Sequence, residues 1–227
     1  AQIAIRESLI DAQTMKEIFF AQDSFTTTGD AEFIGAWRLF DGGHELTGSF
    51  TSEYWTFQGF DFPVFDGDLV WTRDLFEITR ATSGFYGGGL EFTYAMKPLG
   101  SDEQSIATFA PRVNGTELLP LFEAVGISGI RPLGTVGGEV LLEWPTNNFD
   151  DRRGHASLDF VPANEVPLQS RAVRPVGRRI GWSYAERSFA PDGEPWHFPL
   201  GGELDLRFGP ERIDVFSSWI ATPLTAV

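Results

Sequence analysis

The chain has 227 residues, no cysteine and a formal net charge of −15, from 32 acidic and 17 basic side chains. Such a charge repels phosphates and anionic lipid surfaces at long range, so we expect no nucleic-acid partner. The absence of cysteine excludes a disulfide framework and a thiolate metal site. The 21 Phe and 7 Trp residues favour strands over helices.

No apolar run in the sequence approaches the ~20 residues that span a bilayer, and none has the form of a signal peptide. We therefore expect a membrane anchor to lie outside these residues, and we interpret the chain as a fragment of a longer protein. The whole of 1–227 is predicted to be a single repetitive β region, interrupted by an irregular loop at about 162–179.

The first third of the chain alternates between apolar and polar residues with a period of two, which is typical of half-buried strands. In residues 1–30 the alternation is weak. For residues 14–20 we favour a strand over the alternative, a short amphipathic helix. Residues 33–39 alternate clearly, and the sequence Asp41-Gly42-Gly43 predicts a hairpin turn before the chain returns through Phe50.

The stretch 66–94 predicts three short strands joined by turns, with apolar residues on one face. Its opening, DGDLVW at 66–71, returns 135 positions later as GGELDL at 201–206, and a third version begins at Gly138. One short-strand unit is therefore used repeatedly, and each copy shares its apolar face with its neighbours.

The rest of the chain changes pattern twice. Residues 116–125 predict one short helix, preceded by a polar cap at Asn114 and ended by Gly126. Strands are predicted again at 127–144 and 156–160. After the proline- and arginine-rich segment 162–179, four residues are expected to rejoin the sheet: Trp182, Tyr184, Trp196 and Phe198.

Titratable residues in the sequence form no recognisable catalytic motif. The three histidines, His44, His155 and His197, are not at metal-ligand spacing, so we expect no metal, no cofactor and no catalytic residue. Asp66 and Asp68 form an acidic pair that suits a two-carboxylate glycoside hydrolase. Since both alternate with apolar neighbours, we interpret them as part of an outer, solvated face.

Glycine- and aromatic-rich stretches carry a resemblance to a known family: FIGAWRLFDGGHELTGSF at 33–50, FYGG at 85–88, FTYAMKPLG at 92–100, LEWP at 142–145, FGPE at 208–211 and IATP at 220–223. They resemble the repetitive β region of bacterial AsmA-like proteins, in particular the large TamB-like translocation and assembly module proteins. The family's amino-terminal membrane helix is missing here, and its carboxy-terminal region is not recognised.

The resemblance implies an all-β fold, in which an elongated, curled antiparallel sheet forms an open trough called a β-taco. It also implies a non-enzymatic protein of the periplasm or cell envelope, anchored in the inner membrane in its full-length form. Its expected function is to carry phospholipid between inner and outer membranes, to support outer-membrane protein assembly, or both. Its expected partners are phospholipid acyl chains and an outer-membrane barrel assembly protein.

Fourteen apolar residues at alternating positions are the candidates for a lipid groove: Leu69, Trp71, Ile78, Leu90, Phe92, Tyr94, Val140, Leu142, Trp144, Leu204, Leu206, Phe208, Ile213 and Val215. The same alternation fits the core of a closed β-sandwich or barrel. Such a closed domain would act as a binding or interaction module, for carbohydrate among other ligands, or as a glycoside hydrolase. The sequence leaves these alternatives open.

Overall fold

The structure is a computed structural model that describes residues 1–19, 26–99, 103–127, 131–146, 148–163, 197–210, 212–222 and 225–226. In chain order its elements are β1 (Gln2–Asp11), α1 (Ala12–Phe19), β2 (Thr27–Phe40), β3 (Gly43–Phe57), β4 (Phe60–Thr72), β5 (Phe76–Phe85), β6 (Gly88–Lys97), β7 (Ile106–Glu117), α2 (Leu118–Ala124), β8 (Arg131–Pro145), a short 3-10 helix (Phe149–Asp151), β9 (Arg153–Pro162), β10 (His197–Pro199), β11 (Gly201–Gly209), β12 (Arg212–Thr222) and β13 (Thr225–Ala226).

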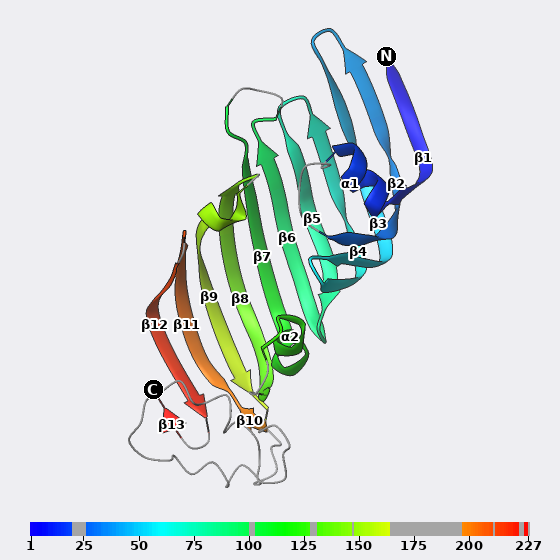
Figure 1. The fold of residues 1–227 in the computed structure, drawn as a ribbon. Coiled ribbons are helices and arrows are strands. Elements are labelled where there is room, and N and C mark those ends of the chain that lie inside the picture. The colour runs from blue at the N-terminus through cyan, green and yellow to red at the C-terminus, as the bar shows by residue number, and fades with distance from the viewer. Residues whose placement is uncertain are drawn as a thin grey trace.

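The strands form one antiparallel sheet in the order β1-β2-β3-β4-β5-β6-β7-β8-β9-β11-β12-β13 (Figure 1). Only β10 lies off this path, where it pairs in parallel with β8. Within the described ranges β1 and β13 do not pair with each other, so the sheet stays open. The prediction of an all-β, open and curled sheet is confirmed, and the alternative of a closed sandwich or barrel is wrong for this part of the chain.

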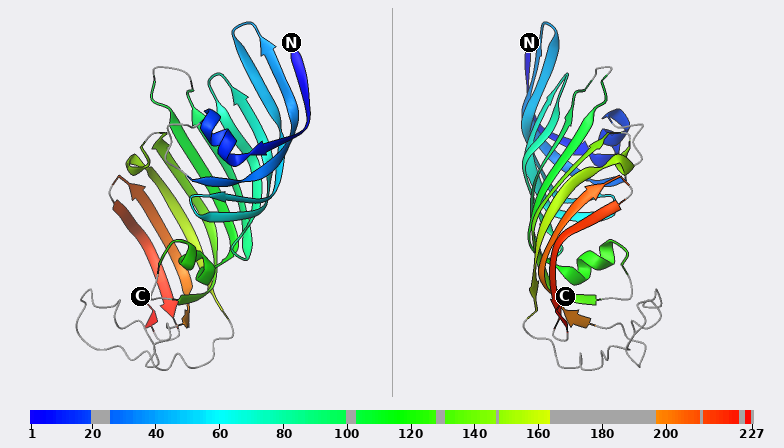
Figure 2. Two further views of the ribbon diagram at one scale, coloured as in Figure 1. Left: turned by 45° about the vertical axis from the view of Figure 1, so that its right-hand side comes forward. Right: turned by 90° about the vertical axis from the view of Figure 1, so that its left-hand side faces the viewer.

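Both helices lie on the same side of the sheet, which we call the inner face; the opposite side is the outer face (Figure 2). The predicted helix near 116–125 is confirmed as α2, but the predicted cap at Asn114 is wrong, because Asn114 lies within β7. Helix α2 follows Glu117 and is followed by Gly126, whose φ of 72° suits a glycine after a helix end.

The strand favoured for residues 14–20 is wrong, because α1 occupies Ala12–Phe19. The backbone N–H of Thr14 donates a 2.7 Å hydrogen bond to Asp11, which satisfies one of the free donors at the helix start. Ala12 is fully buried, and Met15 packs against the same cluster. Burial of this helix face outweighs the weak alternation that favoured a strand.

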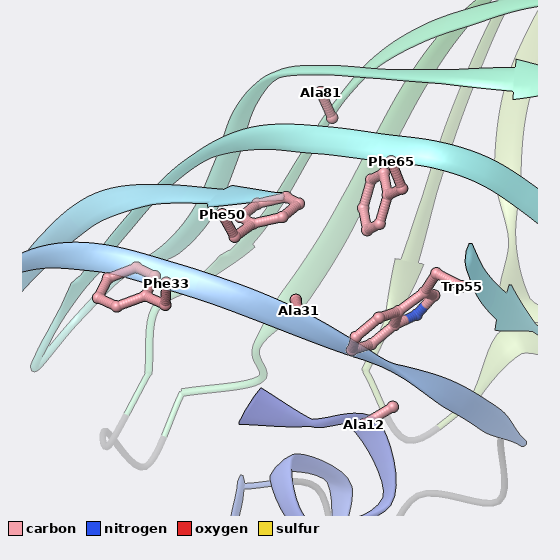
Figure 3. Packing of buried hydrophobic residues seen from close by; sticks show 7 residues of the cluster. All are labelled: Ala12, Ala31, Phe33, Phe50, Trp55, Phe65 and Ala81. Carbon is pink, nitrogen blue, oxygen red and sulfur yellow. The ribbon is translucent and has the colours of Figure 1, made fainter. Parts of the chain in front are cut away.

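The main core lies between α1 and strands β2 to β5 (Figure 3). Phe33 is 2% exposed, and the rings of Phe50 and Phe65 lie 4.9 Å apart. Trp55 completes the cluster, with its ring centroid 6.0 Å from that of Phe65. Large aromatic side chains contribute most of the apolar area in such a cluster, so we place the centre of stability in this part of the sheet.

The outer face carries polar ladders between neighbouring strands. Thr82 donates a 2.9 Å hydrogen bond to Asp66, Ser49 donates one of 2.9 Å to Asp68, and Arg80 forms an ion pair with Asp68. The interpretation that both carboxylates belong to an outer face is therefore confirmed. Of the later segments, Phe198 joins β10 as predicted. The predicted loop from 164 onward, Trp182, Tyr184 and Trp196 lie outside the described residues.

Candidate functional site

Cross-strand register arranges the inner-face side chains in rows that run from strand to strand. Residues directly opposite each other in an antiparallel pair project to the same face. Leu69 of β4 lies opposite Ile78 of β5, which lies opposite Tyr94 of β6. This Tyr94 row continues through Phe109, Leu142, Gly154, Phe208 and Ile213 to β12.

Three further rows run beside the Tyr94 row. The Trp144 row consists of Trp37, Leu46, Trp71, Phe76, Met96, Ala107 and Trp144. The Phe92 row consists of Ala81, Phe92, Pro111, Val140, Ala156, Leu206 and Val215. The Leu90 row consists of Ser83, Leu90, Val113, Gly138, Leu158, Leu204 and Ser218. None of these side chains is charged.

The structure places all fourteen predicted groove residues on these four rows, and therefore on one face of one sheet. The apolar face is open to a large extent. Among the fourteen, only Leu90 is buried, at 4% exposure, whereas Ile213 and Val215 are 53% and 58% exposed. The other eleven are half-buried. In a closed sandwich a second sheet would cover these positions.

The two described helices cover only parts of the inner face (Figures 1 and 2). Helix α1 lies over the first strands, where the main core is, and α2 contacts β8 and β7. Among the described elements none forms a layer over the remainder of β5 to β12. The uncovered surface is therefore a long apolar floor, with α1 over the first strands and α2 beside β7 and β8 in the middle of the strand order.

Aromatic rings connect the rows into one continuous surface. Phe92 stacks on Phe65 with centroids 5.8 Å apart and meets Phe109 at 5.3 Å. Tyr94 and Trp144 come within 6.3 Å although β7 lies between their strands. The side chain in register beside Trp144 on β7 is the small Ala107, which leaves room for this approach.

Sequence reasoning missed several residues of the same rows, among them Trp37, Phe76, Phe109 and Leu158. A signal for Phe109 was present in the sequence, because its large ring lies between the smaller side chains of Thr108 and Ala110. Phe76 follows directly after a turn, where the phase of the alternation is not determined by its preceding neighbours. Pairing register, rather than local alternation, assigns it to this face.

The charged side chains lie off these four rows. No group of three or more His, Asp or Glu residues in the described part of the chain could hold a metal ion. His44 lies on the inner face between Trp37 and Trp71, with ring centroids 6.5 Å and 5.2 Å away. Its buried Nε2 atom has no hydrogen-bond partner.

One tyrosine pair lies at the end of β3, β4 and β5 that is remote from the Trp144 row. Tyr54 donates a hydrogen bond to the Asp61 carboxylate, and this bond raises the pKa of Tyr54. The backbone N–H of Asp61 donates a 3.3 Å hydrogen bond to the hydroxyl of Tyr86. Burial is the main cause of the raised pKa of Tyr86.

Comparison with protein-family models, curated proteins and solved structures finds no match to the chain. The resemblance to AsmA-like and TamB-like proteins therefore stays a prediction from the residues quoted above. No helix in the described ranges is long and apolar enough to cross a membrane.

Proposed function

We propose that this protein is a segment of a cell-envelope protein whose apolar β-trough carries phospholipid between the inner and outer membranes. The observation that supports this proposal is the inner face itself, where four uncharged rows run across the sheet and remain largely uncovered. An apolar surface of this extent is an aggregation hazard unless a ligand or partner covers it. Long, unbranched acyl chains are the ligands that suit this long apolar floor.

Transport along such a floor needs no covalent chemistry. Each CH₂ group removed from water gains about 0.8 kcal/mol. A chain lying on an open floor gains only part of this amount, because one side stays in water. Apolar side chains recur from β5 to β12 along the Tyr94 and Phe92 rows, so a lipid can move between similar weak sites without one large barrier.

Support for outer-membrane protein assembly is the second function that we propose for the same segment. Among the strands that the structure describes, β1 pairs only with β2, so its other edge offers backbone N–H and C=O groups to an added strand. A barrel assembly protein of the outer membrane is the proposed partner. The protein would act in the periplasm, with its membrane anchor elsewhere in the full-length chain and without catalysis of its own.

Native mass spectrometry of the purified protein, followed by organic extraction, tests the lipid proposal. Wild-type protein is expected to carry phospholipid. Leu204→Glu introduces a charge at a half-buried inner-face position, where the carboxylate can stay hydrated, so this variant is expected to lose the lipid and keep its β-sheet circular dichroism.

The matched control is Ile34→Glu. Ile34 is 57% exposed and lies opposite Ser49 on the outer face, so the same charge is introduced away from the floor. This control is expected to retain lipid. A lipid-free wild-type protein, or equal lipid content in the two folded variants, would contradict the proposal.

A further inference from the structure

The two sides of the uncovered floor differ in chemistry. On one side, the Trp144 row lies close to the turns, because Trp71 and Trp144 are the penultimate residues of β4 and β8. On β2 and β3, Leu39 and His44 lie beyond this row on the same face. This row contains three Trp residues and Phe76. Toward the other side, the Leu90 row contains only aliphatic, glycine and serine residues. The floor therefore carries three tryptophans along one aromatic rim, whereas the aromatic residues beyond the Leu90 row on the same face are phenylalanines, Phe85 on β5 and Phe160 on β9.

The width of the floor suits a single acyl chain lying parallel to the strands. Leu90 and Met96 mark its two sides on β6, and six residues of extended strand span about 20 Å. One leaflet of a bilayer has about half of the ~30 Å hydrocarbon thickness, or roughly 15 Å. An acyl chain that lies parallel to the strands thus covers the Leu90, Phe92 and Tyr94 rows. The lipid headgroup then lies on the Trp144 row.

The aromatic rim offers specific contacts to a positively charged headgroup. Indole rings are the strongest aromatic partners of cations, and they prefer the boundary between apolar and aqueous surroundings. Trp37 is 41% exposed, so part of its ring surface is accessible. His44 stands edge-on to both Trp37 and Trp71 and holds an unpartnered Nε2 atom beside them.

The net charge of the protein also favours a headgroup that carries a positive charge. With a formal net charge of −15, the protein repels lipids that carry only a phosphate and attracts a group that carries an ammonium. The turns next to the rim carry both signs of charge: Asp41 lies between β2 and β3, and Arg73 and Asp74 lie together between β4 and β5. A zwitterionic headgroup can place its ammonium toward the carboxylates and the tryptophans and its phosphate toward Arg73.

We propose that the Trp144 row is a headgroup subsite. A zwitterionic phospholipid lies parallel to the strands, with its ammonium over Trp37 and Trp71 and its acyl chains on the Tyr94, Phe92 and Leu90 rows. This inference rests on the proposed function and adds the orientation of the lipid and the class of its headgroup. Trp37, Trp71 and Trp144 are then specificity residues within the trough.

The chain contains no cysteine, so one introduced cysteine carries one fluorescent label. Phe76→Cys places the label on the Trp144 row, and Val113→Cys places it on the Leu90 row. Each labelled protein is mixed with phosphatidylcholine that carries a nitroxide on the headgroup or at the end of an acyl chain. The headgroup nitroxide is expected to quench label 76 more strongly, and the chain-end nitroxide to quench label 113 more strongly.

The outcomes separate the two proposals. Equal quenching of both labels by each lipid, or the reverse pattern, overturns the orientation while lipid binding stands. No quenching of either label by either lipid overturns the lipid-carrier proposal, and the headgroup subsite falls with it. Circular dichroism of each labelled protein must match that of the wild type before the comparison is made.

The tryptophan contribution is tested with Trp71→Leu, which keeps an apolar side chain but removes the indole. The affinity for phosphatidylcholine is expected to fall about fivefold, and that for phosphatidylglycerol to change little. Trp219→Leu is the matched control, because Trp219 is 55% exposed on the outer face opposite Glu203. Equal losses for both lipids, or for both variants, would overturn the headgroup assignment.

Discussion

The ring of Phe33 lies over Gly48 of the neighbouring strand. A Cβ atom at position 48 would be 2.6 Å from Cζ of that ring and 2.3 Å from the backbone oxygen of Ile34. Gly35 faces Gly48 across β2 and β3, so the ring occupies the space of two absent side chains. This close approach keeps Phe33 at 2% exposure on a sheet that is otherwise largely open.

Gly48→Ala is therefore expected to destabilise the protein by about 1–3 kcal/mol, because the added methyl group displaces a buried ring and a backbone oxygen. Urea unfolding followed by circular dichroism measures the change. Gly89→Ala on β6 is the control, since no atom lies within 4 Å of its Cβ position, and it is expected to stay within about 0.5 kcal/mol of the wild type. Similar values for the two variants would contradict the packing described for Phe33.

The sheet is expected to be unevenly stable along its length. Phe65 is 8% exposed and contacts Phe50 and Trp55, so Phe65→Ala is expected to cost about 3–5 kcal/mol. Ile213 is 53% exposed on β12, and Ile213→Ala is expected to cost less than about 1 kcal/mol. Native-state hydrogen exchange should show strong protection in β2 to β4 and weak protection in β12. Uniform protection across these strands would argue against this distribution of stability.

The start of α1 is expected to be sensitive to acid. The hydrogen bond from the Thr14 N–H holds the pKa of Asp11 below its ordinary value of 3.8. A lowered folded-state pKa stabilises the protein above the unfolded-state value, and this contribution is lost as the pH falls through the folded-state value. Thermal unfolding between pH 5 and pH 2 measures it for the wild type.

Asp11→Asn provides the comparison for the acid effect. Asparagine also caps helices but does not titrate in this range, so the variant should lack the part of the acid destabilisation that belongs to Asp11. The difference in melting temperature between wild type and variant is expected to change with pH below about 4. A constant difference would mean that the pKa of Asp11 is the same in the folded and unfolded states, which would contradict the prediction.

Ionisation of Tyr54 is expected to require a higher pH than that of an ordinary tyrosine. Its hydrogen bond to the Asp61 carboxylate favours the protonated phenol and raises the pKa above 10.0. The stabilisation is therefore present below pH 10 and is lost as the pH rises through the folded-state pKa. In Asp61→Asn the tyrosine absorbance at 295 nm should rise at lower pH than in the wild type, and coincident titrations would contradict the interaction.

The period-two alternation placed fourteen apolar residues on one face, but it did not place Phe76, which follows a turn. It could not predict whether that face is covered, because an open sheet and a sandwich place the same apolar residues inward. The strand path decides this question, and Leu69 and Ile213 are joined by a register that passes through six intermediate strands. Local sequence contains no information about such long-range pairing.

Helix α2 was predicted because a glycine marks its end in the sequence. Helix α1 was not favoured, because its formation depends on burial against the core. Gly126 follows α2 as expected. At α1 the alternation of Ile18 with its neighbours favoured a strand, whereas burial of Ala12 against the core favoured the helix. The main cluster was not singled out either, because Phe33, Phe50 and Trp55 look like other aromatic strand residues until α1 covers them.

The order of the strands also affects how such a chain folds during its synthesis and how the sheet can grow by duplication of hairpins. From β2 to β9 every strand pairs with the strand that precedes it in the sequence. Each new hairpin can therefore join the growing edge as it leaves the ribosome, without waiting for distant parts of the chain. Duplication of a hairpin would lengthen the sheet without changing its cross-section, so the distance that the protein spans becomes a matter of gene length.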